Sequence, residues 1–172
     1  LTQQLLKSGA PITEMNIVRK HLSKIQGGQL ALASQAPVVA LVISDVVGDD
    51  PSAIASGPCS PDPSTYADAL AVLARWRVSP PESIAKHLYA GRDGRIAETP
   101  KPGDPRLAHA KTTLIATAHA SLQAAASVFS QAGIRPILLG DSVTGEARDV
   151  AQVYGSLIRE LVRFPDSAFN LP

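Results

Sequence analysis

The sequence predicts an α/β protein: a Rossmann-like layered fold with a mostly parallel sheet flanked by helices. The first observation is the continuous apolar run of the strand Val38–Ser44, which is typical of a strand buried on both faces of a parallel sheet. The second is the β-α-β-α order of the last third, which predicts parallel strands joined by helices. The third is size: 172 residues with 45% hydrophobic composition favour a single α/β domain over 1–172.

Helical patterns occupy the chain before this strand. The chain opens within a helix that carries Leu5, and a second helix is expected to begin with Thr13 as its N-cap and Glu14 in its first turn. Apolar residues at helical spacing predict the buried face of that second helix: Met15, Val18, Leu22 and Ile25. Gly27-Gly28 ends or bends it, and a short helix is predicted over 29–34.

The remaining elements follow from apolar spacing and from Pro and Gly signals. Asp62-Pro63 predicts a helix start, since Pro is favoured at the first helical position. The apolar stripe of that helix is Tyr66, Leu70 and Leu73. Further helices are expected over 82–90, 120–132 and 144–162, strands over 112–117 and 136–140, and a loop over 92–105. The last helix is expected to turn one stripe inward: Ala147, Val150, Tyr154, Leu157 and Leu161. Such a sheet is small, so further strands are expected to come from outside this chain.

Composition excludes several classes of function. The net charge of +1 gives no footprint for nucleic acid, and no apolar run approaches the roughly 20 residues of a membrane span. Cys59 is the single cysteine, and no signal peptide precedes the first helix, so we expect a cytoplasmic protein. The histidines show no metal-ligand spacing and are interpreted as surface residues: His21, His87, His109 and His119.

Polar residues follow the first strand directly. Asp45, Asp49 and Asp50 come after its carboxyl end, where open α/β sheets bind ligands, together with the turn Ser56-Gly57. Three carboxylates could hold Mg²⁺, or they could accept hydrogen bonds from the hydroxyls of a sugar acid. A solvated acidic loop is the alternative.

Other candidates lie on helices and at a later strand end. Asn16, Arg19 and Lys20 share a helix face that could bind a carboxylate or phosphate, or could simply be solvated. Asp141 ends the last predicted strand, and Glu146 lies at a helix start that could meet an anion or serve as a cap. Neither a G-x-G-x-x-G dinucleotide motif nor a Walker P-loop occurs.

Taken together, ordered motifs along most of the chain resemble the glycerate 2-kinase family with a C-terminal MOFRL domain, some members of which are labelled hydroxypyruvate reductase. The motifs are Ser8-Gly9-Ala10, Val18-Arg19-Lys20-His21-Leu22-Ser23, Gly27-Gly28, Ser44-Asp45-Val46, Gly48-Asp49-Asp50, Ile54-Ala55-Ser56-Gly57-Pro58, Lys101-Pro102-Gly103-Asp104-Pro105 and Gly145-Glu146-Ala147-Arg148. Gln26 and Gln29 depart from the pattern, because the family usually has basic residues there.

The resemblance implies transfer of phosphate from ATP, with Mg²⁺, to the 2-hydroxyl of D-glycerate in a cleft between two α/β domains. If the chain belongs to such a kinase, Arg19, Lys20 and Asp45 are the catalytic candidates, and Asp45, Asp49 and Asp50 are expected to serve Mg²⁺ or the glycerate hydroxyls. Substrate or cofactor contacts fall to Asn16, Ser44, Asp49, Ser56, Gly57, Asp141 and Glu146. The resemblance also implies that residues 1–172 are part of the N-terminal domain of a longer protein and are inactive alone, because the upstream segment and the MOFRL domain are absent.

Two other functions remain open at this point. The reductase label implies reduction of hydroxypyruvate by NAD(P)H, against which the missing dinucleotide motif argues. A non-catalytic binding or oligomerisation domain is the third possibility. The oligomeric state stays open, a homodimer included.

Overall fold

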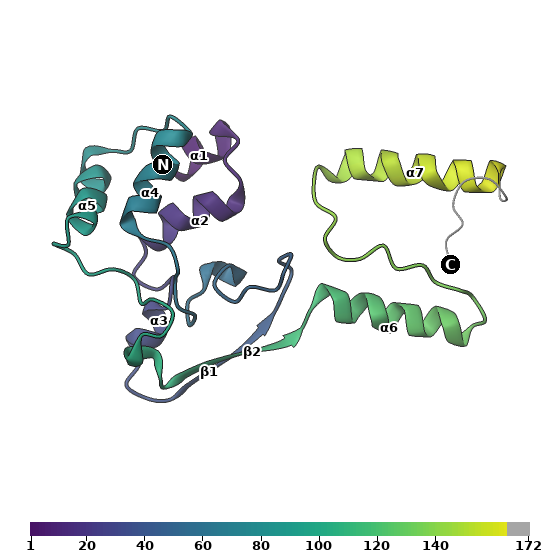
Figure 1. The fold of residues 1–172 in the computed structure, drawn as a ribbon, viewed down its shortest axis with the longest axis horizontal. Coiled ribbons are helices and arrows are strands. Elements are labelled where there is room, and N and C mark those ends of the chain that lie inside the picture. Colours follow the sequence, from purple (N-terminus) through teal and green to yellow (C-terminus); the bar gives the residue numbers. More distant parts are fainter. Residues whose placement is uncertain (165–172) are drawn as a thin grey trace.

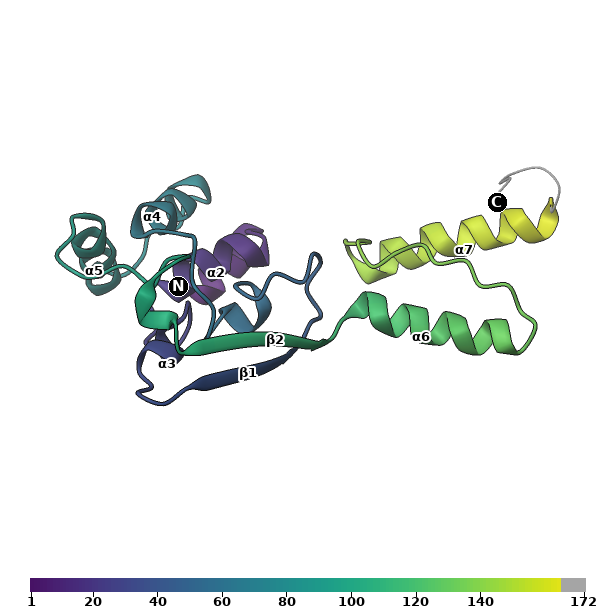
Figure 2. The same ribbon diagram turned by 60° about the horizontal axis from the view of Figure 1, so that its bottom comes forward.

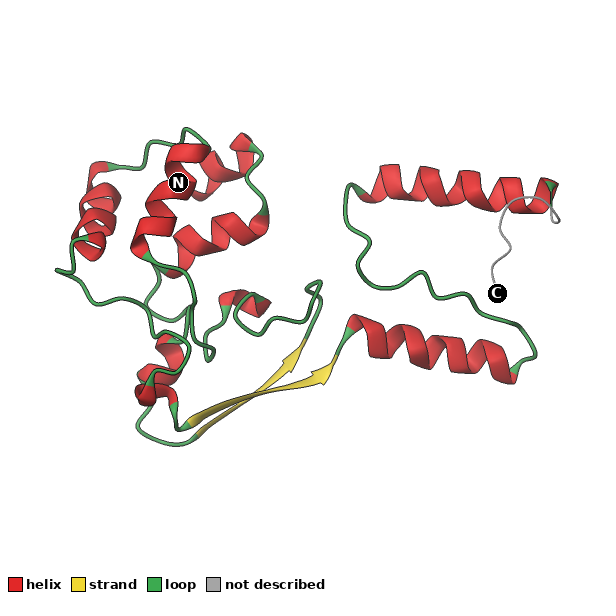
Figure 3. Cartoon of the chain, viewed as in Figure 1, coloured by secondary structure: helices red, strands yellow, loops and turns green. Residues whose placement is uncertain are grey.

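The computed structural model describes residues 1–164 and shows a mixed α/β chain, which confirms the predicted fold class (Figure 1). Figure 3 shows that helices dominate and that the strands form one narrow sheet. In chain order the elements are α1 (Thr2–Ser8), α2 (Ile12–Lys20), α3 (Gln29–Leu32), β1 (Val38–Ile43), η1 (Ile54–Ser56), α4 (Tyr66–Arg75), α5 (Glu82–Arg92), η2 (Pro105–Leu107), β2 (Ala110–Ala116), α6 (Ala118–Gln131) and α7 (Ala147–Arg163). Within residues 1–164, none of the helices has the length and apolar character needed to cross a bilayer.

The core lies among α1, α2, α4 and α5. Its buried side chains come from the apolar stripes of these helices: Leu5, Met15, Val18, Tyr66, Ala69, Val72, Leu73 and Leu88. Met15 and Val18 confirm the predicted face of α2, but the helix ends at Lys20, so Ile25 is 56% exposed and Leu22 only half-buried. The chain turns after Lys20 because Gly27 and Gly28 must reach the segment that follows β1.

Two helix starts differ from the sequence-based prediction. Pro11, not Thr13, occupies the N-cap of α2. The next long helix begins at Tyr66 rather than at Asp62-Pro63, because Thr65 forms a capping box: its Oγ1 accepts a hydrogen bond from the backbone N–H of Asp68, whose carboxylate accepts one from the N–H of Thr65. Asp62 is therefore free to turn into the interior.

The sheet contains β1 and β2 in parallel, as predicted, with Val38 opposite Ala110 and an irregularity after Val42. The expectation that the first strand is buried on both faces is wrong. Val39, Leu41 and Ile43 are 67%, 64% and 68% exposed. Their face of the sheet carries no helical layer in the part of the chain that the structure describes, so the strand alternates between a covered and an open face.

Helices α6 and α7 extend as a pair beyond the end of β2, away from the helical core (Figures 1 and 2). Neither helix has a fully buried residue. Of the inward stripe predicted for α7, Val150, Tyr154 and Leu161 are half-buried, whereas Ala147 and Leu157 are exposed. The strand expected over 136–140 is also wrong: that segment has no strand partner, and Ile137 and Leu139 are exposed. The helix predicted over 120–132 is confirmed, with Thr117 as its N-cap.

Candidate functional site

A pocket of about 400 Å³ lies between α2 and the segment that follows β1. It brings together predicted site residues that are far apart in the sequence. Its lining residues are Ile12, Thr13, Asn16, Arg19, Gln26, Asp45, Val46, Ala53, Ala55 and Ser56. We call it the Arg19 pocket. Its position at the carboxyl end of a parallel strand is the usual place for a ligand in an α/β sheet.

The wall formed by α2 supplies the positive charge. Asn16 and Arg19 lie three positions apart and therefore on one helix face, and the Nη1 of Arg19 donates a hydrogen bond to Oδ1 of Asn16 at 3.1 Å. Arg19 is half-buried, and among the described residues no carboxylate lies within ion-pair distance of it. Its remaining N–H groups are therefore available to an anionic ligand.

The opposite wall begins where β1 ends. Ser44 is buried, and its Oγ accepts a hydrogen bond from the N–H of Val46 and donates one to the carbonyl of Val46, both at 3.3 Å. This local turn leaves Asp45 exposed at the pocket. No hydrogen bond to the Asp45 carboxylate occurs within the described residues, so its oxygens can accept from a ligand hydroxyl.

The segment Ala55–Gly57 closes the pocket in a strained conformation. These three consecutive residues have φ values of 51°, 62° and 60°, which for non-glycine residues cost on the order of 1–3 kcal/mol each. Gly57 is required, since an added Cβ would lie 2.9 Å from the carbonyl oxygen of Ser52. Backbone hydrogen bonds hold the turn: the N–H of Gly27 donates to the carbonyl of Ser56 at 2.9 Å, and that of Gly28 to the carbonyl of Gly57 at 2.7 Å.

The structure does not gather the three predicted magnesium ligands. A left-handed turn at Gly48 and Asp49 separates Asp45 from Asp50. The Asp50 carboxylate instead accepts hydrogen bonds at 2.8 Å from both the N–H and the Oγ of Ser52. No group of three or more His, Cys, Asp or Glu residues within 1–164 is arranged to hold a metal ion, so the predicted three-carboxylate site is not formed there.

Lys20 does not reach the Arg19 pocket either. Being the next residue along α2, it points about 100° round the helix from Arg19. Its Nζ lies 3.3 Å from Oδ1 of Asp62, and the two side chains are 7% and 0% exposed. The predicted contact of Lys20 with an anionic ligand is thus replaced by a buried ion pair.

Asp62 is the centre of this interior network, and sequence reasoning missed it. Its carboxylate also accepts hydrogen bonds from the N–H and Oγ of Ser64, at 3.1 and 2.7 Å, and from Oγ1 of Thr99 at 3.1 Å. Burial alone would raise the pKa of Asp62, but the Ser64 hydroxyl and the Lys20 charge outweigh it and hold that pKa below the ordinary value for an aspartate. Asp62 is therefore ionised in the folded protein at neutral pH.

His21 belongs to the same network, so its predicted place at the surface is wrong. It is 1% exposed, its Nδ1 lies 2.8 Å from the carbonyl of Ile17, and its Nε2 lies 3.3 Å from a carboxylate oxygen of Glu98. The loop over 92–105 supplies this last contact and packs against the core through buried Thr99. Lys101 fixes the loop through its Nζ, which donates to Glu98 at 3.1 Å and to the carbonyl of Ser64.

Asp141 and Glu146 lie apart from the Arg19 pocket. Both belong to the segment that joins α6 to α7, and neither lines the pocket. Glu146 occupies the N-cap position of α7 without a capping hydrogen bond from its side chain. Their predicted ligand contacts stay predictions.

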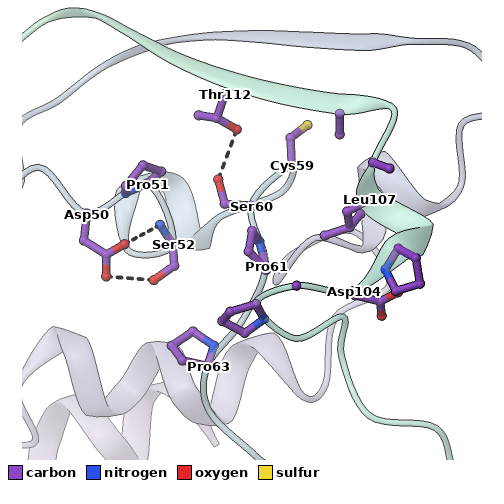
Figure 4. A pocket seen from close by; sticks show the side chains of 15 residues that line it. Asp50, Pro51, Ser52, Cys59, Ser60, Pro61, Pro63, Asp104, Leu107 and Thr112 are labelled. Atoms are coloured by element: carbon purple, nitrogen blue, oxygen red, sulfur yellow. Dashed lines mark hydrogen bonds between the residues drawn. The ribbon is translucent and has the colours of Figure 1, made fainter.

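A second pocket of about 660 Å³ is lined by residues of the segment after β1, of the segment around η2 and of β2 (Figure 4). Asp50 and Ser52 form one end, half-buried Cys59 lies beside Ser60, and prolines make up much of the rest. The Oγ of Ser60 and Oγ1 of Thr112 are 3.2 Å apart and satisfy each other. Asp50, Ser52, Ser60 and Thr112 are thus all partnered within this pocket, whereas the Asp45 carboxylate has no hydrogen-bond partner among the described residues.

Within residues 1–164, a guanidinium without a counter-ion and a carboxylate without a hydrogen-bond partner thus meet at the carboxyl end of a parallel strand, which makes this pocket the candidate ligand site of an α/β protein. A family model described as a domain of unknown function, DUF4147, matches residues 1–89. The chain belongs to the DUF4147 family.

Named relatives confirm the resemblance to glycerate 2-kinases. The glycerate 2-kinase of Pyrococcus horikoshii is 40% identical over 93% of this chain and 36% of its own length, and the D-glycerate 2-kinase of Thermotoga maritima is 39% identical over 100% and 39%. An Agrobacterium vitis protein, provisionally named a hydroxypyruvate reductase, is 48% identical over 91% of this chain and 34% of its own length. The chain thus spans about a third to two-fifths of the length of these relatives.

A solved structure agrees with the sequence relatives. The crystal structure of a glycerate kinase from Thermotoga maritima superimposes with a TM-score of 0.73 at 38% identity, covering 99% of this chain and 39% of that one. A Pyrococcus horikoshii crystal structure gives a TM-score of 0.69 at 40% identity, covering 93% of this chain and 36% of that one.

Proposed function

We propose that this chain is part of a kinase that transfers phosphate from ATP to the 2-hydroxyl of D-glycerate, and that the Arg19 pocket binds the glycerate. The observation that carries the proposal is that two groups without an ionic partner among the described residues, the guanidinium of Arg19 and the carboxylate of Asp45, line one pocket. Glycerate has the matching groups, a carboxylate and hydroxyls. The relatives named glycerate 2-kinase support the same reaction.

Each pocket residue then has a chemical role. Arg19 binds the substrate carboxylate through parallel N–H donors, a geometry that guanidinium groups favour, and Asn16 keeps the side chain turned to the pocket. Asp45 accepts a hydrogen bond from the 2-hydroxyl and so orients its oxygen toward the phosphate. Such positioning accounts for most of the catalysis in phosphoryl transfer.

Magnesium and the nucleotide belong to the proposal as well. Mg²⁺ is held by one or two carboxylates together with substrate phosphates, so Asp45 can supply the protein ligand although the three-carboxylate site is not formed. The metal, when bound, neutralises charge on the transferred phosphate. We also propose that residues 1–172 contribute one part of the N-terminal domain of a longer cytoplasmic protein, as the share of the relatives that they span suggests.

A direct assay separates the kinase from the reductase that the Agrobacterium name suggests. The full-length protein, meaning a protein of the relatives' length that carries this chain, is assayed for ADP release with D-glycerate and for NADH oxidation with hydroxypyruvate. We expect ADP release that depends on D-glycerate. Robust NADH oxidation without ATP, and no ADP release, would overturn the proposal.

Two substitutions test the pocket itself. In the full-length protein we expect Arg19→Ala to raise the KM for D-glycerate by about 10- to 100-fold, since a hydrogen-bonded charge contributes roughly 1.5–3 kcal/mol. Asp45→Asn should lower kcat with a smaller effect on that KM. Arg95→Ala and Asp93→Asn are matched controls, because both side chains are exposed, pair with each other and lie outside the pocket. Wild-type kinetics for Arg19→Ala would remove the pocket from the proposal.

A further inference from the structure

We infer that Asp62 is a positioning residue that holds the walls of the Arg19 pocket together, and that Lys20 acts through Asp62 rather than on the substrate. The inference rests on the proposed function, since it assigns the pocket to glycerate. Asp62 is fully buried and cannot itself touch a ligand in the pocket.

The first connection runs from Asp62 to α2. Lys20 directly follows Arg19, and its Nζ is held 3.3 Å from Oδ1 of Asp62. Removing either partner leaves a buried charge without its counter-ion, which is strongly unfavourable. The last turn of α2, which carries Arg19, is therefore kept in place by an ion pair on a neighbouring face of the helix.

The second connection runs through Gly27 to the strained turn. A Cβ at Gly27 would lie 3.3 Å from Oδ2 of Asp62 and 3.4 Å from Cβ of Lys20, so the glycine backbone is packed between the two side chains. The N–H of Gly27 donates to the carbonyl of Ser56, and Gln26, the preceding residue, lines the pocket. The position of the ion pair thus sets the positions of Gln26 and of Ser56, which both line the pocket.

The third observation is that the Asp62 carboxylate is fixed from several directions. Oδ1 accepts from Lys20 and Ser64, Oδ2 accepts from Thr99, and Nε2 of His21 lies 3.9 Å from Oδ2. These partners come from α2, from the residue that follows it, from the segment before α4 and from the loop over 92–105. A carboxylate held in this way can keep neighbouring segments in register, but it has no freedom to take part in the reaction.

A double-mutant cycle in the full-length protein tests the inference. Lys20→Met, Asp62→Asn and the double variant are compared with wild type in the ADP-release assay. We expect each single substitution to raise the KM for D-glycerate by about 10-fold and to change the KM for ATP less than about 2-fold. In the double variant, the two effects on the KM for D-glycerate should not multiply. If the two effects multiply, Lys20 contributes independently of Asp62 and the inference is wrong.

Misfolding and failure of the proposed function are distinguished from failure of the inference. Partial unfolding lowers kcat and leaves both KM values unchanged, so it differs from the effect expected here. Thr99→Val is a milder variant, because it removes one hydrogen bond to Asp62 while both charges stay in place. We expect Thr99→Val to raise the KM for D-glycerate by a smaller factor than Asp62→Asn does. If wild type releases no ADP, the proposed function fails, and amide hydrogen exchange decides the positioning role. Asp62→Asn should then speed exchange at Gly27 and Gly28, while unchanged exchange would refute the role.

Discussion

Gly91 offers a stability test that follows directly from the packing behind the site. It lies within α5, where alanine is ordinarily preferred to glycine by roughly 0.5–1 kcal/mol. A Cβ at this position would lie only 2.3–2.5 Å from ring atoms of Tyr66. The ring has little room to move, because it is 4% exposed and packs edge-on against His21, with ring centres 4.7 Å apart, and against His87 at 5.7 Å.

The expected loss of stability follows from two opposing effects. Overpacking of a well-packed core costs about 1–3 kcal/mol, and at this contact distance we expect that cost to exceed the helical gain. Gly155→Ala in α7 is the matched control, since a Cβ there meets only Nη1 of the flexible Arg159 side chain, at 3.6 Å. The control isolates the helical gain. We therefore expect Gly91→Ala to be less stable than Gly155→Ala by about 1–3 kcal/mol.

Urea unfolding of the chain measures this difference. Trp76 is the single tryptophan and packs against the core cluster, so its fluorescence reports on the body that contains Gly91. Far-UV circular dichroism is recorded on the same samples to follow α7, which contains Gly155. We expect the transition midpoint to fall for Gly91→Ala and not to fall for Gly155→Ala. An unchanged or raised midpoint for Gly91→Ala would refute the close packing of α5 against Tyr66.

Two further predictions concern the buried carboxylate. Gly27→Ala and Gly94→Ala both place alanine at a left-handed φ, 62° and 74°, but only Gly27 is packed against Asp62 and Lys20. Only Gly27→Ala should therefore raise the KM for D-glycerate, and an equal effect of the two would contradict the positioning role. The pKa of Asp62 is lower in the folded protein than in the unfolded chain, so its stabilising contribution is complete above the unfolded pKa and is lost as the pH falls through the folded pKa. Urea midpoints measured between pH 7 and pH 2 should consequently fall less steeply at the acid end for Asp62→Asn than for wild type, and parallel profiles would count against the ion pair.

The local pattern of apolar and polar residues in the sequence was sufficient to predict part of the candidate site. The spacing of Asn16 and Arg19 places them on one helix face, and the apolar run before Asp45 identifies a strand whose carboxyl end lies at the candidate pocket. These features depend on residues close together in sequence, which is why periodicity predicts them. The grouping of these residues into one pocket followed only from the family resemblance and from the fold.

The rest depends on contacts between distant segments. Lys20 and Asp62 are 42 positions apart, and nothing in the sequence near Asp62-Pro63 distinguishes a buried ion pair from a helix start. The segment 136–140 shows the opposite failure. It has the composition of a strand, but a strand also needs a hydrogen-bonded neighbour, and none lies beside it within residues 1–164.

Binding of D-glycerate to the full-length protein tests the central claim most directly. Titration calorimetry compares wild type, Arg19→Ala and the exposed control Arg95→Ala. A pocket in which Arg19 binds the substrate carboxylate predicts a Kd about 10- to 100-fold higher for Arg19→Ala and an unchanged Kd for Arg95→Ala. Equal affinity of wild type and Arg19→Ala would contradict the assignment of this pocket to glycerate.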